Sequence, residues 1–305
     1  MVEFGYAPPA CEMKELRRLA VEKCDNLDGV KDGLVLEPER CFAAFDPRSH
    51  IGDQFVCDEA GGKTLKITEA GIQVAKMALA GEEGAELSKS PFAWTATMCD
   101  YSKNSSDGAA AEVPRCKPNP WAYAMPWVQY FLLRDPAKPL DRTSCFQSRL
   151  PDVARLVHQS RQWYTSLVGT FDPDLSALRD GGGKLLLLHG MADEAIPLNN
   201  SRNYYDAVAA RDPDRVDGYL RYFEAPGVSH CGIGGEGNGL YPVRMLDVLR
   251  AWVEQGVAPD SVPAAVRAAD PATGGRMTRN LCRFPRKAKY DGVGNVKDAA
   301  SFKCV

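Results

Sequence analysis

The 305-residue sequence lacks the features of several protein classes. It contains no run of about 18 consecutive apolar residues, which argues against a membrane-spanning helix. It has no excess of basic charge either, since 37 lysines and arginines face 40 acidic residues and the formal net charge is −3. Such a chain creates no field that would gather nucleic acid or an anionic membrane surface. We therefore expect neither nucleic acid nor a membrane as a partner.

A CxxC pair is also missing, although the chain has ten cysteines. Ten is a high number for a cytosolic chain of this size, and without the CxxC spacing of zinc and redox sites disulfides are the favoured use. Disulfides indicate the periplasm or the outside of the cell. The first residues, MVEFGYAPPACEMKE, nevertheless lack the basic start and apolar centre of an export signal. We expect a secreted or periplasmic protein whose natural N-terminus differs from Met1.

Hydrophobic residues make up 45% of the chain, which is enough to bury a core, and their pattern changes near residue 172. Before this point, helical patterns at 12–24 and 68–81 alternate with long loops rich in Gly, Pro, Ser and Asp. No buried strand is obvious in this half. The change predicts two parts, residues 1–171 and residues 172–305.

The second part has the pattern of a parallel sheet covered by helices. Residues 185–188 form a short apolar run between glycines, as expected for a central strand. A helix is predicted over 199–212, with Asn or Ser as its cap, and a second strand within 218–227. A further helix is predicted from Pro242 to Gly256. The order strand, helix, strand, helix predicts the α/β class.

Polar residues with catalytic potential follow both predicted strands. Asp193 stands in HGMADEAIP after the first strand, and His230 stands in APGVSHCG after the second. In open α/β sheets, functional side chains lie in loops at the carboxyl ends of strands. An acid followed by a histidine is the chain order of the last two members of a Ser-Asp-His triad. A single Asp in a turn or a single His is usually structural, but the two in this order favour a hydrolase.

The segments DPDLSALRDGGGKLLLLHGMADEAIP and SHCG resemble the tannase and feruloyl esterase family of α/β-hydrolases, which also includes enzymes that cleave terephthalate monoesters. The resemblance implies the C-terminal part of a doubly wound α/β-hydrolase sheet in residues 172–305. Residues 1–171 would form a large, mostly helical and loop-rich lid domain. The implied activity is hydrolysis of galloyl, feruloyl or related aromatic esters through an acyl-serine intermediate, with Asp193 and His230 in the catalytic triad.

The same resemblance gives roles to half of the cysteines. In this family a disulfide joins the cysteine beside the catalytic serine to the cysteine beside the catalytic histidine, which here is Cys231. The resemblance also implies bridges between Cys24 and Cys41 and between Cys282 and Cys304. It leaves open the connectivity of the other five, which cannot all pair among themselves: Cys11, Cys57, Cys99, Cys116 and Cys145.

The segment CDNLDGVKDGLV resembles the calcium loop of the family. By position, the carboxylates of Asp25, Asp28 and Asp32 and the backbone oxygens of Val30 and Leu34 would bind a structural Ca²⁺ ion. Calcium prefers several hard oxygen ligands, and two glycines let the chain curl around an ion. The spacing is not that of an EF-hand, so the residues by themselves indicate only an acidic turn.

The nucleophile of the family is missing from the sequence. It lies in a Gly-Cys-Ser-x-Gly-Gly turn, whereas this chain has neither GxSxG nor Cys-Ser. Ser229 adjoins His230, but neighbouring side chains on an extended segment point to opposite sides. Ser144 precedes Cys145 in the reverse order and without a glycine turn. We therefore expect the chain alone to be inactive and an N-terminal chain or segment to carry the serine.

The substrate is not specified further by the sequence. An aromatic cluster can be a stacking surface for an aromatic acid or, more commonly, the core of a lid. The cluster in NPWAYAMPWVQYFLL consists of Trp121, Tyr123, Trp127, Tyr130 and Phe131. Two alternatives to an aromatic ester hydrolase remain. One is a non-catalytic calcium-binding or interaction protein derived from such an esterase, and the other is a different α/β-hydrolase such as a peptidase, which would make the acidic loop and the His-Cys pair coincidental.

Overall fold

The computed structural model describes eight stretches of the chain: residues 5–80, 97–101, 115–118, 124–137, 150–193, 196–232, 239–269 and 274–305. These residues form two compact units. The first unit holds the described residues up to Ala20 and those between Asp46 and Thr170. The second unit holds Val21–Phe45 and the described residues from Phe171 onward.

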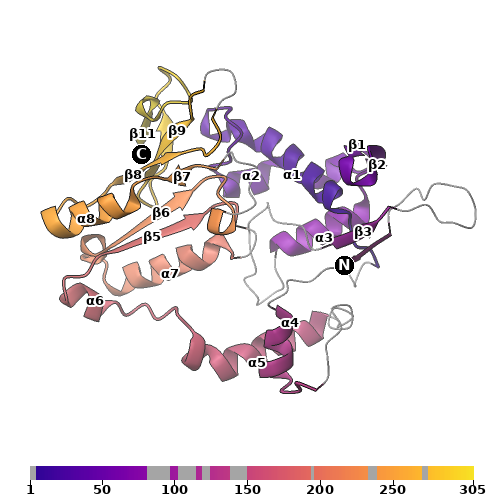
Figure 1. The fold of residues 1–305 in the computed structure, drawn as a ribbon, viewed down its shortest axis with the longest axis horizontal. Coiled ribbons are helices and arrows are strands. Elements are labelled where there is room, and N and C mark those ends of the chain that lie inside the picture. The colour runs from indigo at the N-terminus through magenta and orange to yellow at the C-terminus, as the bar shows by residue number, and fades with distance from the viewer. Residues whose placement is uncertain are drawn as a thin grey trace, which may run out of the picture. The chain divides into compact units, whose positions relative to one another are not determined.

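A parallel pair of strands forms the centre of the second unit (Figure 1). β5 (Leu185–Gly190) and β6 (Leu220–Ala225) pair residue by residue along their whole length. α7 (Leu198–Arg211) lies between them in the sequence, because parallel strands need a crossover connection. α7 follows Pro197 and has no side-chain cap, whereas the sequence predicted a capping Asn or Ser. The predicted order of strand, helix and strand is confirmed.

Helices cover both faces of this strand pair. The leucines at 185 and 187 pack in a cluster with Val208 of α7. The leucines at 186 and 188 point to the other face, where they pack in a cluster with Val248 of α8 (Met245–Gln255). The apolar run of β5 is therefore explained by a strand that has helices on both sides.

Antiparallel strands follow β6 in the sequence. β8 (Ser261–Ala265) lies between β7 (Tyr241–Pro242) and β9 (Thr278–Cys282) in a three-stranded sheet. β10 (Ala288–Tyr290) and β11 (Phe302–Cys304) form a separate antiparallel pair. These strands complete the described C-terminal part of the second unit (Figure 1).

The predicted helix start at Pro242 is wrong. Pro242 lies in β7, and the following residue, Val243, still donates its N–H to the Pro263 carbonyl of β8 at 2.8 Å. α8 begins only after Arg244, whose φ of 60° turns the chain out of the strand. The predicted end is confirmed, since Gly256 caps α8 with a left-handed φ of 73°.

Residues 21–45 belong to the second unit, whereas the sequence analysis placed them in the lid. Their short helices are η2 (Asp25–Asp28) and α2 (Pro38–Ala44). A disulfide between Cys24 and Cys41 closes the segment. An ion pair then holds it to β9, with Arg279 Nη2 at 2.7 Å from Asp32 Oδ2 and both side chains at most 3% exposed. Because of this contact between residues far apart in the sequence, segment 21–45 joins the second unit although it precedes residue 172.

The first unit consists of helices and two short antiparallel strand pairs. Its elements in chain order are most of α1 (Ala10–Cys24), η3 (Pro47–His50), β1 (Gln54–Cys57), η4 (Asp58–Ala60), β2 (Lys63–Lys66), α3 (Glu69–Ala80), β3 (Thr97–Asp100), β4 (Arg115–Pro118), α4 (Ala124–Pro126), η5 (Trp127–Leu132) and α5 (Leu150–Val168). The helices predicted at 12–24 and 68–81 are confirmed as α1 and α3. The four strands were missed because each has only four residues, too few for a visible alternation. Across the described residues, no helix combines the length and apolar character needed to traverse a bilayer.

Four disulfides connect eight of the nine described cysteines. The pairs are Cys11–Cys57, Cys24–Cys41, Cys99–Cys116 and Cys282–Cys304. The expected use of cysteine in disulfides is confirmed, including both pairs that the resemblance implied. Cys145 lies outside the described residues. Each bridge restricts the unfolded chain and so stabilises the fold, by about 3 kcal/mol for loops of this size on the chain-entropy model.

Gly190, the last residue of β5, lies directly against the loop that follows β6. A Cβ atom at this position would lie 2.3 Å from the backbone oxygen of Val228. We predict that Gly190→Ala lowers the free energy of unfolding by about 1–3 kcal/mol, because backbone must move to relieve the overlap. Urea unfolding followed by circular dichroism measures the loss. Gly218→Ala is the control, since no atom of the described residues lies within 4 Å of its added Cβ. Equal stability of the two variants would contradict the close approach.

Candidate functional site

The parallel pairing brings the loops after β5 and β6 to the same edge of the sheet. Both strands end at paired residues, Gly190 and Ala225. Backbone hydrogen bonds continue beyond the strands: Met191 donates its N–H to the Ala225 carbonyl at 2.9 Å, and Ala192 donates to the Val228 carbonyl at 3.0 Å. The two loops therefore leave the sheet side by side.

Asp193 and His230 meet at this edge. His230 Nδ1 lies 3.1 Å from Asp193 Oδ2, and the ring nitrogen donates because a carboxylate oxygen accepts. The other carboxylate oxygen, Oδ1, accepts the N–H of Ile196 at 2.7 Å. Asp193 is 7% exposed, whereas the His230 side chain is 37% exposed. A buried carboxylate that holds one nitrogen of a half-exposed imidazole can orient a general base.

A second imidazole, which the sequence analysis did not single out, faces the same carboxylate. His189 of β5 is 8% exposed, and its Nε2 lies 3.6 Å from Asp193 Oδ2. The same Nε2 lies 3.0 Å from the Ile196 carbonyl oxygen, and Nδ1 lies 2.7 Å from Ser201 Oγ. One signal was available in the sequence, since His189 is the polar residue that ends the apolar run in LLLLHG.

The turn that carries His230 is sharply bent. It forms η8 (His230–Gly232), in which Cys231 has a φ of 51°. A left-handed conformation costs a non-glycine residue about 1–3 kcal/mol, so the surrounding structure must enforce it. Cys231 is exposed and is the one unbridged cysteine among the nine that the structure describes. Ser229, which precedes His230, is 7% exposed.

The acidic loop, residues 25–34, contains carboxylates with little access to water. Asp25 Oδ1 accepts the N–H groups of Asp32 and Gly33 at 3.0 and 2.9 Å. Burial, together with the neighbouring charges of Asp32 and Asp25, raises the pKa of Asp28 to about 6. Burial also raises the pKa of Asp32, although the charge of Arg279 opposes this shift. Burial and neighbouring negative charge both disfavour the ionised form of these carboxyl groups, and a bound cation would offset both effects.

The acidic loop fits Ca²⁺ in its chemistry. Three carboxylates and nearby backbone carbonyls form the set of hard oxygen donors that Ca²⁺ prefers. The three carboxylates of Asp25, Asp28 and Asp32 do not, however, form a tight group of donor atoms in this structure. Only one set of three His, Cys, Asp or Glu side chains among the described residues brings its donor atoms within 4.8 Å of one another, and it lies elsewhere.

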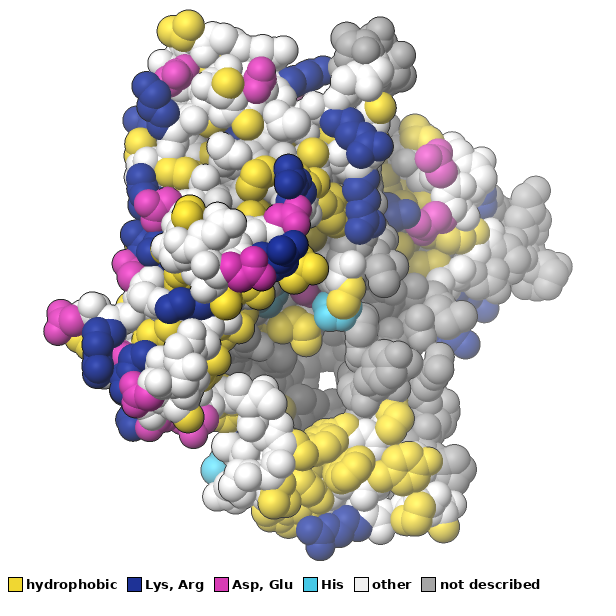
Figure 2. Space-filling model, turned by 60° about the vertical axis from the view of Figure 1, so that its left-hand side comes forward, with side chains coloured by type: hydrophobic (Ala, Val, Ile, Leu, Met, Phe, Trp, Pro, Cys, Tyr) yellow, Lys and Arg dark blue, Asp and Glu magenta, His cyan; other side chains and the backbone are white. Residues whose placement is uncertain are grey.

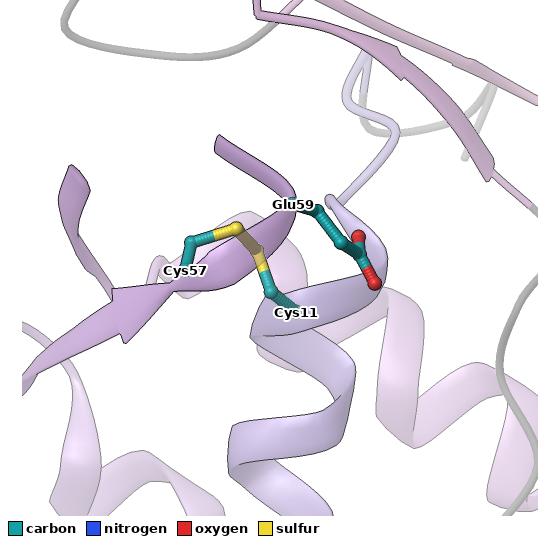
Figure 3. Close-up of side chains that lie close together, drawn as sticks. All are labelled: Cys11, Cys57 and Glu59. Atoms are coloured by element: carbon teal, nitrogen blue, oxygen red, sulfur yellow. A yellow bond between two sulfur atoms is a disulfide. The ribbon is translucent and has the colours of Figure 1, made fainter. Parts of the chain in front are cut away.

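That set consists of Cys11, Cys57 and Glu59 in the first unit. Figure 3 shows that the two cysteines are bridged to each other, with the Glu59 carboxylate beside them. Disulfide sulfurs are not thiolates, which are the form of cysteine that binds metals. Glu59 Oε1 instead pairs with Lys14 Nζ at 2.6 Å. This cluster is therefore a structural cross-link and a surface ion pair.

The acidic loop packs directly against the loop that carries His230. Leu34, 2% exposed, belongs to the same core cluster as Val228. A Cβ atom on Gly227 would lie 2.8 Å from Leu34 Cδ2 and 3.1 Å from Gly239 Cα, and Gly227 also has a left-handed φ of 68°. Glycine at this position permits the close approach. Any rearrangement of the acidic loop would therefore displace Gly227 and Val228, which lie just before His230 in the sequence.

Aromatic side chains gather on the first unit, over η5 and α5. The rings of Trp127 and Phe131 stack with centroids 4.6 Å apart, and Tyr164 meets them edge-on at 5.0 and 5.8 Å. Hydrophobic side chains over these helices reach the surface (Figure 2), and Tyr130 and Phe131 are 52% and 45% exposed. These two side chains therefore lie at the surface of the described residues. Two further members of the cluster lie outside the described residues: Trp121 and Tyr123.

Solved structures identify the class of fold. Tannin acyl hydrolase from Aspergillus niger matches with a TM-score of 0.78 at 22% identity, over 99% of this chain and 55% of that chain. An esterase from Aspergillus oryzae matches with a TM-score of 0.65 at 26% identity, over 98% of this chain and 57% of that chain. Together with the helix-covered parallel strands, these similarities confirm the α/β-hydrolase fold class.

Sequence comparison identifies the family. The family described as tannase and feruloyl esterase matches residues 2–305. A probable feruloyl esterase from Arthroderma benhamiae is 35% identical over 299 residues, which cover 97% of this chain and 53% of that protein. A mono(2-hydroxyethyl) terephthalate hydrolase from Piscinibacter sakaiensis is 31% identical over 310 residues, which cover 92% of this chain and 49% of that protein. The chain belongs to the tannase and feruloyl esterase family, and it spans about half the length of the curated relatives it matches.

Arg279 is the ion-pair partner of Asp32, and its own Nε and Nη1 are buried without a hydrogen-bond partner among the described residues. We predict that Arg279→Met, measured with chelator present, lowers the free energy of unfolding by about 3–5 kcal/mol, because it leaves a buried carboxylate unpaired. Adding Asp32→Asn should recover part of the loss. Denaturant titration of the two single variants, the double variant and the wild type measures this coupling.

The control for this cycle is Arg244→Met. Arg244 pairs with Asp247, but these side chains are 76% and 52% exposed. Exposed pairs contribute little, so this variant should unfold close to the wild type. Losses that simply add for Arg279→Met and Asp32→Asn would show that the buried pair is not coupled.

Proposed function

We propose that this chain is part of a carboxylic ester hydrolase that acts on galloyl, feruloyl or related aromatic esters by a Ser-Asp-His acyl-enzyme mechanism. The hydrogen bond between His230 Nδ1 and Asp193 Oδ2 carries the proposal. The family and the names of two relatives, a feruloyl esterase and a terephthalate ester hydrolase, support an aromatic ester as the substrate.

Each of the two side chains would have one role. His230 would accept the proton of the serine hydroxyl as the serine attacks the ester carbonyl, and would then give this proton to the leaving alcohol. Asp193 would hold the Nδ1–H bond and stabilise the imidazolium, an attraction that is stronger in a buried site than in water. Water would then attack the acyl-serine, with His230 again as the base.

The serine would come from a segment outside these 305 residues. The sequence contains no Gly-Cys-Ser turn, and the chain spans 53% and 49% of the two relatives named above. Cys231 would pair with the cysteine beside that serine, which would hold base and nucleophile within reach of each other. Within the described residues β5 pairs only with β6, so its other edge can accept a further strand from that segment.

A structural Ca²⁺ ion in the acidic loop is a further part of the proposal. Its ligands would be Asp25, Asp28, Val30, Asp32 and Leu34. The burial of these carboxylates supports the site, because a bound cation would offset their repulsion. By fixing Leu34 against Gly227, the ion would also support the loop that carries His230.

Export to the periplasm or secretion completes the proposal. Four disulfides support it, because such bridges persist in oxidising compartments. The Ca²⁺ loop is compatible with the same surroundings, where weak calcium sites are occupied.

The assay compares this chain with a version extended upstream until it contains a Gly-Cys-Ser turn. Methyl gallate, methyl ferulate and mono(2-hydroxyethyl) terephthalate are the substrates. We predict that only the extended protein hydrolyses at least one of them. His230→Ala in that protein should lower kcat/KM by about 10³-fold or more, because the serine then has no base.

His50→Ala is the matched control for this assay. His50 Nδ1 lies 2.8 Å from Asp53 Oδ2 on the surface of the first unit, so it forms a histidine–carboxylate pair away from the proposed site. It should leave kcat/KM unchanged. Hydrolysis by the 305-residue chain alone, or full activity of His230→Ala, would refute the assignment. Inactivity of both lengths would favour the non-catalytic alternative.

Removal of Ca²⁺ tests the acidic loop separately. We predict that a chelator lowers the melting temperature and that added Ca²⁺ restores it, because an ion that binds only the folded state stabilises by about 2.7 kcal/mol at a hundredfold excess over Kd. Asp28→Asn should remove most of this response, whereas Asp247→Asn, at an exposed position of α8, should retain it. An identical melting curve with and without chelator would exclude the site.

A further inference from the structure

We infer that His189 and Ser201 are positioning residues that fix Asp193 against His230 through a hydrogen-bonded chain from α7 to the candidate site. The inference rests on the proposed function in one respect, namely that Asp193 orients His230 as the catalytic base. The chain runs from Ser201 of α7 to His189 of β5 and then to the backbone of Ile196, which itself holds Asp193. Each link is between 2.7 and 3.0 Å long.

The partners of His189 determine which of its nitrogens carries the proton. The Ile196 carbonyl oxygen can only accept, so Nε2 must donate to it. Ser201 has a hydroxyl proton to give, so it can donate to the lone pair that remains on Nδ1. The neutral ring with its proton on Nε2 satisfies both contacts, and the same Nε2 lies 3.6 Å from Asp193 Oδ2.

His230 requires the opposite arrangement. Its Nδ1 faces Asp193 Oδ2 at 3.1 Å and therefore carries the proton. Two imidazoles thus approach one carboxylate oxygen with different nitrogens, His230 with Nδ1 and His189 with Nε2. The tautomer of a histidine is set by such partners and determines what its other nitrogen can do.

The geometry also explains how a residue that does not touch the substrate would affect the reaction. Ile196 gives its N–H to Asp193 Oδ1 and receives the Nε2–H of His189 on its carbonyl oxygen. The carboxylate is therefore held on Oδ1 through the backbone of Ile196, and its Oδ2 lies 3.6 Å from His189 Nε2. Without His189, the loop residue Ile196 loses the partner that fixes its carbonyl, and the carboxylate can rotate away from His230.

Nitrogen-15 NMR of the 305-residue chain, labelled in its histidine rings, tests the inference directly. The chain has only four histidines. The variants His50→Gln and His158→Gln identify the signals of these two residues, and the remaining signals belong to His189 and His230. At mildly alkaline pH we expect His189 to show a protonated Nε2 and an unprotonated Nδ1, and His230 to show a protonated Nδ1. A protonated Nδ1 on His189, as the neutral tautomer or as the cation, would overturn the inference.

Substitution of Ser201 separates positioning from mere packing. Ser201→Ala removes the donor to Nδ1 but leaves the Ile196 carbonyl as the acceptor for Nε2–H. The His189 Nδ1 signal should therefore move to that of a nitrogen without a hydrogen bond while Nε2 stays protonated, and the His230 Nδ1–H signal should shift. Ser201→Thr keeps a hydroxyl and should restore both signals. Unchanged His230 signals in Ser201→Ala would also overturn the inference. If Ser201→Ala fails to fold, the tautomers in the wild type and the spectrum of Ser201→Thr still test the inference.

Kinetics of the upstream-extended protein provides a second readout. His189→Gln keeps an N–H near the position of Nε2, whereas His189→Leu removes both polar contacts. We expect kcat to fall more for His189→Leu than for His189→Gln, with KM unchanged for both, because only the orientation of the base is affected. Equal kcat losses, or a loss confined to KM, would argue against positioning. Because the NMR signals do not require turnover, an inactive extended protein with the expected tautomers would refute the proposed function and leave the positioning of Asp193 intact.

Discussion

The parallel pairing of β5 with β6 is the constraint on which the second unit depends. Its register ends both strands together, at Gly190 and Ala225, so that the loops with Asp193 and His230 leave the same edge of the sheet. The same register gives α7 and α8 their apolar surfaces, because alternate leucines of β5 face each helix. A slip by one residue would exchange the two faces and would separate the acid from the histidine.

Segment 21–45 connects stability to the candidate site. It is held by a buried ion pair between Asp32 and Arg279, and a buried pair of this kind is costly to break because the remaining charge has no water around it. Leu34 of the same segment packs against Gly227, close to His230 in the sequence. The charges of the acidic loop and the position of the imidazole therefore depend on the same segment. Binding of the proposed Ca²⁺ ion to this segment would affect the position of His230 through the packing of Leu34.

Much of the second unit could be predicted because it depends on neighbouring residues in the chain. An apolar run predicted β5 and an alternating pattern within 218–227 predicted β6. The rule that functional side chains follow strands in α/β sheets predicted that Asp193 and His230 would meet. Two predictions were wrong because they depend on contacts between residues that are far apart in the sequence. Pro242 lies in a strand because the next residue bonds to β8, and residues 21–45 join the second unit because Asp32 meets a partner 247 residues later. His189 was missed for another reason, because its partners lie on the loop after β5 and on α7 at spacings that no helix or strand period reports.

The central claim is that Asp193 acts through His230, and a double-mutant cycle in the upstream-extended protein tests it most directly. The cycle compares kcat/KM for Asp193→Asn, His230→Ala and the double variant on the best of the aromatic esters. Side chains that act as one unit give losses that do not add, so the double variant should be no slower than His230→Ala alone. Losses that multiply would mean that the two side chains act independently, and they would contradict the account.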